Sequence, residues 1–380
     1  MKITLNGYYG FSNYGDELFN LASVLGARRW WPDHPLDILG SPVHGIDAKF
    51  RVPAWFPPAL YTAPHFGGKM SRLAYLAAAL LTRDLIVYAG GSTLSYSSIL
   101  KKIQRIAAER SWTKFAAIGV SIGPFADAAD QEEAARFLRR FTFISVRDKQ
   151  SIALLEEMKV PLTPLFARDL VGALPLLLPA NDQKQKATKT LGVSVCNYES
   201  YTGGDAAQEQ RRNEALFEGI SRHAKREGTL VRIFCLNTNP RWGDMALSRQ
   251  LQAYLRERGT ESEIISCQNN LIGTWHGLAS CAAVLCVRLH AGITAYLTHV
   301  PFALAEYHRK CTDYLDDIGQ PASLRIPANL TDPARVDEVI NELFRGEAKP
   351  TLASEIYSAE AAKNFTEVPW AKASSAASPP

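Results

Sequence analysis

The sequence lacks the long hydrophobic segment that a membrane-spanning helix needs. No apolar run approaches about 18 residues, and the longest, Leu73–Leu81, is rich in alanine and predicts a buried helix. The opening residues, MKITLNGYYG, are interrupted by glycine too early to form the apolar part of a signal peptide. We therefore expect a cytoplasmic protein, with contact to the inner face of the membrane left open.

The sequence also lacks the charge pattern that would indicate nucleic-acid binding and the cysteine spacing that would indicate a metal site. The 42 Lys and Arg residues exceed the 38 Asp and Glu residues only slightly, and no stripe of interleaved basic and aromatic residues occurs. The six cysteines all follow position 195 without a CxxC pair or typical zinc spacing. Cys196, Cys235 and Cys286 fall in apolar, strand-like runs, where a thiol behaves as a small hydrophobe. We expect no nucleic-acid partner, no structural metal and no cofactor.

The chain instead shows a regular alternation of short apolar or β-branched runs with longer amphipathic stretches. This alternation is typical of βαβ units and predicts an α/β fold with parallel sheets. In the first half we expect strands at 2–7, 36–39, 84–89, 115–120 and 143–146, and helices at 16–28, 69–82, 98–110, 130–140 and 149–158. In the second half we expect strands at 191–196, 230–236, 263–265, 283–287 and 302–305, and helices at 206–227, 242–258, 271–280, 291–298, 309–318 and 332–345.

The length of 380 residues is too great for one ordinary core and suits two domains. A polar stretch, residues 179–190, has the composition of a linker. The predicted organisation is an N-terminal Rossmann-like domain (1–178), the linker (179–190), a C-terminal Rossmann-like domain (191–330), a C-terminal helical segment (331–365) and a disordered tail (366–380). Two such domains facing a cleft would bind ligands beyond the carboxyl ends of their strands.

Glycine and small hydroxyl side chains follow two of the expected strands. In GYYGFSNYGDELF, residues 7–19, three glycines precede a helix that opens near Asp16. Glycine lets the backbone approach a ligand and the amides of a helix start favour anions, but Asp16 and Glu17 could equally cap the helix. In YAGGSTLSYSSI, residues 88–99, the small residues either leave room for a substrate or form a tight turn.

Arginines follow two further strands. In FISVRDKQS, residues 143–151, Arg147 is either an anion clamp or the partner of Asp148 in a surface pair. In CVRLHAGITA, residues 286–295, a backbone that stays extended to position 290 would place Arg288 and His290 on one side and Leu289 in the core. Arginines at strand ends in both domains predict a site for a small polyanion.

The environment of His290 depends on the helix expected to begin near Ala291. The positive end of that helix would lower the pKa of His290 and keep the imidazole available as a base near neutral pH. The alternative is a histidine that merely caps the helix.

Read together, these segments resemble the polysaccharide pyruvyl transferase family. The motifs that carry the resemblance are Asn13-Tyr14-Gly15-Asp16-Glu17, Gly90-Gly91, Gly119-Val120-Ser121-Ile122-Gly123-Pro124, Ser145-Val146-Arg147-Asp148 with Ser151, Arg288-Leu289-His290-Ala291, Val300-Pro301-Phe302, and Tyr307 with Lys310. They span residues 7–310 in order. Two departures concern the acceptor pocket: Ser92 follows Gly91 where a third glycine is common, and residues 292–295 are smaller than usual.

The resemblance implies a glycosyltransferase-B-like fold and transfer of the pyruvyl group of phosphoenolpyruvate onto two hydroxyls of a sugar residue. It assigns donor binding to Arg147 and Arg288 and catalysis to His290. We expect substrate contacts from Asn13, Gly15, Asp16, Gly90, Gly91, Ser92, Thr93, Leu289 and Lys310. Lys310 could equally be an ordinary lysine at a helix end.

Two other functions compete with this interpretation. A sugar-nucleotide glycosyltransferase of the same architecture would use a carboxylate such as Glu306 to hold the ribose, and a non-catalytic protein would bind a glycan or anion in the cleft. The sequence leaves open whether the acceptor is free, nucleotide-linked or carried on a membrane lipid. For a lipid-linked oligosaccharide, Trp30-Trp31 and the aromatic residues of 53–66 are candidate contacts with the membrane.

Overall fold

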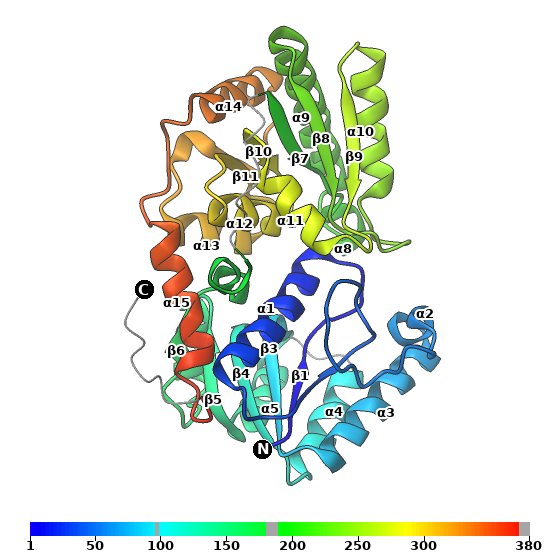
Figure 1. Ribbon diagram of the computed structural model, residues 1–380, viewed down its shortest axis with the longest axis vertical. Coiled ribbons are helices and arrows are strands. Elements are labelled where there is room, and N and C mark those ends of the chain that lie inside the picture. Colours follow the sequence, from blue (N-terminus) through cyan, green and yellow to red (C-terminus); the bar gives the residue numbers. More distant parts are fainter. Residues whose placement is uncertain (96–98, 180–188, 372–380) are drawn as a thin grey trace. The chain divides into compact units, whose positions relative to one another are not determined.

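The computed structural model describes residues 1–95, 99–179 and 189–371, which form two compact units, each built around a six-stranded parallel sheet (Figure 1). The first unit comprises Met1–Phe11, Asp16–Leu178 and the described residues from Tyr357 onward. The second comprises Ser12–Gly15 and the described residues between Pro179 and Ile356. The predicted α/β class with parallel sheets is confirmed.

The first unit has the strand order β2-β1-β3-β4-β5-β6, with every pair parallel. Its strands are β1 (Ile3–Asn6), β2 (Leu36–Leu39), β3 (Leu85–Leu94), β4 (Lys114–Ile122), β5 (Phe141–Val146) and β6 (Leu165–Phe166). Its helices are α1 (Tyr14–Trp30), α2 (Pro58–Thr62), α3 (Phe66–Thr82), α4 (Ile99–Glu109), α5 (Ala128–Leu138), α6 (Lys149–Glu157) and α7 (Leu174–Leu177). The chain order reverses between β1 and β3, which is the switch point where ligands bind in such sheets.

The central strands of the first unit are apolar along almost their whole length, because helices cover both faces of a parallel sheet. In β4 every residue from Phe115 to Val120 is buried. The rings of Phe115, Phe137 and Phe141 pack edge-on or tilted with centroids 5.0 to 5.9 Å apart, and fix α5 against the sheet.

The second unit has the order β12-β11-β10-β7-β8-β9, again with parallel pairs. Its strands are β7 (Thr190–Ser194), β8 (Leu230–Cys235), β9 (Ser262–Ser266), β10 (Ala283–Cys286), β11 (Phe302–Ala305) and β12 (Arg325–Ile326). Its helices are α8 (Glu199–Thr202), α9 (Ala206–Glu227), α10 (Met245–Glu257), α11 (Leu271–Ala279), α12 (Leu289–Leu297), α13 (Arg309–Ile318) and α14 (Pro333–Arg345). Its switch point lies between β7 and β10, and the six cysteines are buried with free thiols.

The last helix, α15 (Ser354–Thr366), belongs to the first unit from Tyr357 onward. There the ring of Phe365 is fully buried and stacks on Trp30 with centroids 5.4 Å apart. Trp370, which falls in the predicted tail, packs on Trp31 at 5.6 Å. Residues 372–380 of that tail and 180–188 of the predicted linker lie outside the described residues.

Two local expectations are wrong. The strand expected to end at residue 89 continues to Leu94, because Gly90 and Gly91 take φ angles of +76° and +70° at an irregularity within the strand and do not end it. Residues 286–290 do not stay extended: β10 ends at Cys286, Arg288 is the N-cap residue, and α12 begins at Leu289. In the described part of the chain, no helix is both long and apolar enough to cross a membrane.

Candidate active site

Arg288 lies at the switch point of the second unit, directly after β10. Its backbone N–H donates to Ser194 Oγ at the end of β7 (3.3 Å), which ties the two strand ends together. Its side chain forms a two-point ion pair with Asp244, with Nε 2.9 Å from Oδ2 and Nη2 2.5 Å from Oδ1. Asp244 is the N-cap residue of α10 and its side chain is 1% exposed. Because two hydrogen bonds reach the two oxygens of one carboxylate, the ion pair fixes the plane of the guanidinium.

The charge of Arg288 is secure at any physiological pH. Burial alone lowers the pKa of Arg288, but the adjacent Asp244 carboxylate outweighs it, and the pKa lies well above its ordinary value. Nearby, burial raises the pKa of the Cys196 thiol to about 12, so Cys196 stays a neutral thiol. A guanidinium that one carboxylate holds in a fixed orientation is a planar donor group suited to binding an anion.

His290 lies in the first turn of α12, against the segment Ser12–Gly15. A Cβ on Gly15 would come within 2.6 Å of Cε1 of His290, so only glycine leaves room for the imidazole in this position. The Tyr14 hydroxyl lies 3.2 Å from Thr294 Oγ1, which in turn donates to the carbonyl of His290 (2.8 Å). The loop therefore fixes the start of α12 from one side.

Backbone hydrogen bonds hold this loop to the end of β8. Tyr14 N–H donates to the carbonyl of Leu236 (2.9 Å), and Thr238 N–H donates to that of Ser12 (2.9 Å). Asn13 forms an isolated antiparallel β-bridge with Asn237, and its side-chain Oδ1 accepts a hydrogen bond from Gly15 N–H (3.1 Å). Asn13 and Gly15, predicted from a glycine-rich turn, thus shape the surroundings of His290.

An aromatic group stands beside Arg288 at the ends of β7 and β11. The rings of Tyr198 and Tyr307 meet edge to face with centroids 5.2 Å apart, and the Lys310 ammonium lies 5.9 Å from the Tyr198 ring. Lys310 is in the first turn of α13, where its N–H donates to His308 Nδ1 (3.1 Å). The structure therefore brings Arg288, Leu289, His290 and Lys310 into the same unit, with Leu289 buried.

Arg147 lies in the first unit, at the end of β5. Its Nη1 is 2.7 Å from Asp169 Oδ2, and its Nε donates to Ser121 Oγ at 2.8 Å. Burial lowers the pKa of Arg147, but Asp169 more than compensates and the pKa lies above its ordinary value. The carboxylate paired with Arg147 is therefore Asp169 and not Asp148, whereas the helix cap expected with the alternative is present: Asp148 accepts from Ser151 N–H at the start of α6 (2.8 Å).

The glycine pair of β3 lies next to the Phe19 ring that packs against Arg147. A Cβ on Gly90 would come 2.5 Å from Cγ of Phe19, so the glycine admits the Phe19 ring. The guanidinium of Arg147 lies over that ring, 5.7 Å from its centroid. Gly90 therefore makes room for a side chain of α1.

The remaining predicted residues are also in the first unit. Asp16 lies in the first turn of α1, and Ser92 and Thr93 belong to β3. The Ser92 carbonyl accepts a hydrogen bond from Ser95 (2.9 Å), and Thr93 lines a cavity. Arg147 thus falls in a different unit from Arg288 and His290.

Sequence reasoning missed Asp244 and Tyr198. Asp244 is the last residue before α10, so its position as a helix N-cap was readable, but its pairing with Arg288 bridges 44 positions. Tyr198 follows the expected strand 191–196, and the rule that ligands bind beyond strand ends could have found it.

The two candidate membrane contacts differ sharply in exposure. Trp31 is 2% exposed and donates to the Phe365 carbonyl (2.8 Å), and the partly buried Trp30 stacks on the Phe365 ring, so both side chains pack within the first unit. In contrast, Trp55 is 80% exposed and Phe66 is 77% exposed.

Comparison with solved structures shows the same architecture in UDP-N-acetylglucosamine 2-epimerases. The putative enzyme of Listeria monocytogenes has a TM-score of 0.58 at 10% identity, covering 97% of both chains. That of Methanocaldococcus jannaschii has 0.60 at 8%, covering 94% of this chain and 98% of the other. That of Neisseria meningitidis, bound to UDP-GlcNAc, has 0.57 at 12%, covering 97% and 98%. The fold is therefore the predicted glycosyltransferase-B-like one, with two Rossmann-like units.

Sequence comparison identifies the family. No curated protein matches this chain. The model of the family described as polysaccharide pyruvyl transferase matches residues 13–231, more than half of the chain, including the loop beside His290 and the segment of Arg147. Because this match covers more than half of the chain and the fold is the one expected for the family, the chain belongs to the polysaccharide pyruvyl transferase family.

Proposed function

We propose that this protein transfers the pyruvyl group of phosphoenolpyruvate onto two hydroxyls of one sugar residue, producing a cyclic ketal and phosphate during synthesis of a surface or exopolysaccharide. The observation that supports this most is the placement of Arg288 and His290 at the start of α12, next to the loop that carries Gly15. These residues follow β10 at the switch point of the second unit, in a chain of a pyruvyl transferase family.

Phosphoenolpyruvate carries a carboxylate and a phosphate, and both suit the planar fork of a guanidinium. We assign Arg288 to one of these anions, because Asp244 already orients it and the positive end of α12 begins at the next residue. Lys310 and the hydroxyl of Tyr198 or Tyr307 are further candidates for the phosphate. Arg147 keeps the role of second donor-binding arginine that the family resemblance implies.

The reaction adds one proton to the donor and removes two from the acceptor. Protonation of the methylene carbon makes a methyl group and an oxocarbenium-like centre at the neighbouring carbon. One sugar hydroxyl adds to that centre, and a second then displaces phosphate. Of the two hydroxyl protons, one balances the new methyl group and the other leaves with phosphate. A single histidine that both accepts and donates protons suffices for this exchange, and we assign it to His290.

The replacement His290→Ala tests the assignment. Removal of a general acid–base group costs about 10²–10⁴-fold in rate, so we expect phosphate release from phosphoenolpyruvate to fall at least about 10²-fold. Phosphate is measured with a polysaccharide-derived acceptor mixture present. His44→Ala, an exposed histidine of the first unit, should retain the full rate. A His290→Ala variant with near-native turnover would rule out the role of His290.

Thermal shift distinguishes the proposed donor from a sugar nucleotide. A ligand that binds the native state raises the melting temperature, so phosphoenolpyruvate should stabilise the protein and UDP-sugars should not. The carboxylate considered for holding a ribose, Glu306, is engaged with Arg325, with Oε1 2.6 Å from Nη2 and Oε2 3.2 Å from Nε. Stabilisation by sugar nucleotides alone would favour a glycosyltransferase. Binding of phosphoenolpyruvate without any phosphate release would favour a non-catalytic protein.

A further inference from the structure

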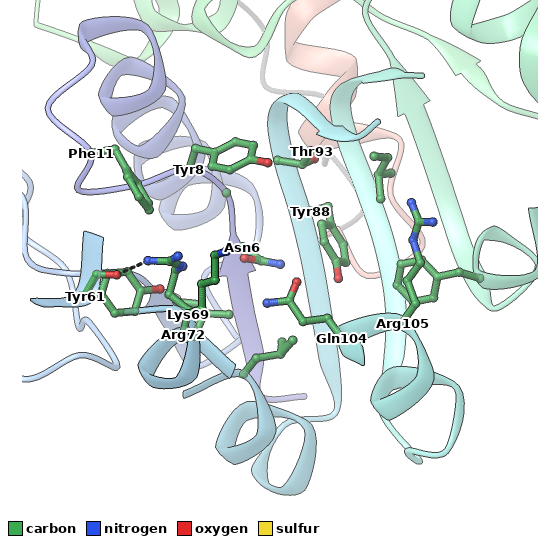
Figure 2. A pocket seen from close by; sticks show the side chains of 15 residues that line it. Asn6, Tyr8, Phe11, Tyr61, Lys69, Arg72, Tyr88, Thr93, Gln104 and Arg105 are labelled. Carbon is green, nitrogen blue, oxygen red and sulfur yellow. Dashed lines mark hydrogen bonds between the residues drawn. The ribbon is translucent and has the colours of Figure 1, made fainter. Parts of the chain in front are cut away.

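The first unit contains a cavity of about 260 Å³, and among the described residues that line it only Thr93 belongs to the predicted site residues (Figure 2). Asn6 and Tyr8 reach it from the end of β1, and Thr93 reaches it from β3. It therefore opens at the switch point between β1 and β3, where an α/β sheet is expected to bind a ligand. Its volume is near the lower end of ligand pockets, roughly 300 Å³, and suits a group of the size of one sugar residue.

The charge of the cavity is positive. Fifteen described residues line it, of which Lys69, Arg72 and Arg105 are cationic and none is a carboxylate. Arg105 is neutralised by Asp130 at 3.6 Å, and both side chains are buried. Arg72 instead donates to the carbonyls of Tyr61 and Ala63, and within the described chain neither Arg72 nor Lys69 has a carboxylate partner. Two positive charges therefore remain for an anionic ligand.

Side-chain amides give the cavity the means to bind hydroxyl groups. Figure 2 shows Asn6 and Gln104 directed toward the middle of the cavity, with the hydroxyl of Tyr88 beside them. An amide offers both donors and an acceptor, which neighbouring sugar hydroxyls need. Burial raises the pKa of Tyr88 to about 12, so its hydroxyl keeps its proton. Oγ1 of Thr93 is buried and makes no hydrogen bond within the described chain, which leaves a polar atom for a ligand.

One wall of the cavity is aromatic. The rings of Tyr8 and Phe11 meet edge to face with centroids 6.2 Å apart, and Phe11 and Tyr61 lie 6.4 Å apart. Arg72 packs over the Phe11 ring at 5.9 Å, which holds a cation at the end of the wall. Aromatic faces bury the apolar C–H face of a sugar ring while its hydroxyls remain directed at amides.

We propose that this cavity binds one sugar residue that carries a negative charge, as a carboxylate or a phosphate. The anion faces Lys69 and Arg72, the hydroxyls bond Asn6 and Gln104, and the ring lies against Tyr8 and Phe11. That this sugar belongs to the acceptor of pyruvyl transfer rests on the proposed function, whereas the binding does not depend on it.

Equilibrium binding to the full chain, without phosphoenolpyruvate, tests the proposal. Ligand-observed NMR titrations use glucose, glucuronate and glucose 1-phosphate, so that the two charged probes separate a carboxylate from a phosphate. We expect saturable binding of at least one charged probe, at least about tenfold tighter than glucose. Equal binding of all three probes, or no saturable binding of either charged probe, would overturn the proposal.

Matched variants locate the binding. Lys69→Gln removes an exposed cation of the cavity and should weaken binding of the charged probe about tenfold. Gln104→Ala should weaken binding of both the charged probe and glucose. Lys114→Gln removes another exposed lysine and should change nothing, because Lys114 lies at the amino end of β4, whereas the cavity lies beyond the carboxyl ends of β1 and β3. Binding that is unaffected by Lys69→Gln would place the ligand elsewhere and refute the proposal. Phosphate release is measured independently, so charged-sugar binding without turnover would contradict only the pyruvyl transfer.

Discussion

Gly15 lies so close to His290 that a single added methyl group tests the geometry of the site. Gly15 is in the first turn of α1, where alanine is a better helix former than glycine by roughly 0.5–1 kcal/mol. The new Cβ would overlap the imidazole and force it to move. Because misplacing a reacting group by about 1 Å can cost roughly 10²-fold, we expect Gly15→Ala to lower the rate of phosphate release by about that factor with a nearly unchanged melting temperature.

The control for this prediction is Gly67→Ala, also near the start of a helix. A Cβ at Gly67 meets nothing closer than 3.4 Å, so that variant should keep both its activity and its stability. A folded Gly15→Ala variant with full activity would mean that the position of the His290 imidazole does not matter to the reaction.

The residues with the strongest chemistry were readable from sequence, but their partners were not. Arg147 and Arg288 are polar residues at the ends of apolar strands, a pattern that local sequence reveals. The carboxylates that orient them, Asp169 and Asp244, are 22 and 44 positions away in the chain. No local pattern links such pairs, because only the order of strands in each sheet brings them together. The alternation argument at position 288 singled out Arg288 and His290 on the basis of a local structure that is wrong, since α12 begins at Leu289.

At the scale of elements, long periodic helices were predicted well, whereas very short strands and the continuation of β3 past its glycine pair were not. The expected helices at 206–227 and 309–318 coincide with α9 and α13. By contrast, β6 and β12 have two residues each, which is too short for any periodicity. The glycine pair of β3 indicated a chain turn, whereas both glycines lie within the strand at positive φ, and the buried Phe19 ring leaves no room for a Cβ at Gly90.

The helix α15 stabilises the first unit through a contact that its own sequence does not reveal. Phe365 is fully buried between Trp30 and Trp31, at 5.4 and 5.7 Å between ring centroids. Truncating a buried phenylalanine costs about 3–5 kcal/mol, so Phe365→Ala should lower the free energy of unfolding of the first unit by that amount. Urea unfolding followed by tryptophan fluorescence measures it. Ile356→Ala, 53% exposed on the same helix, should cost less than about 0.5 kcal/mol, and equal effects of the two variants would contradict a docked α15.

At the scale of the whole molecule, the segment at and before the start of α3 carries two strongly exposed aromatic side chains. Trp55 and Phe66 are 80% and 77% exposed, and Phe66 begins α3, the helix that also supplies Lys69 and Arg72 to the cavity. Exposed apolar groups of this kind mark interaction surfaces, and tryptophan is favoured at membrane–water interfaces. The net charge of +4 is too small to hold the protein on a membrane by itself.

We therefore expect the aromatic side chains to carry any binding to a lipid surface. Cosedimentation with phosphatidylglycerol vesicles should retain the native chain, and the double variant Trp55→Ala/Phe66→Ala should bind several-fold less. The control is Leu81→Ala/Trp112→Ala, which removes side chains that are 87% and 101% exposed. Leu81 lies at the other end of α3, which at 17 residues is about 25 Å long. If both double variants lose vesicle binding equally, exposed apolar side chains in general would be responsible, and not the segment near the cavity. The hypothesis that a membrane lipid delivers the acceptor at this end of α3 would then have to be abandoned.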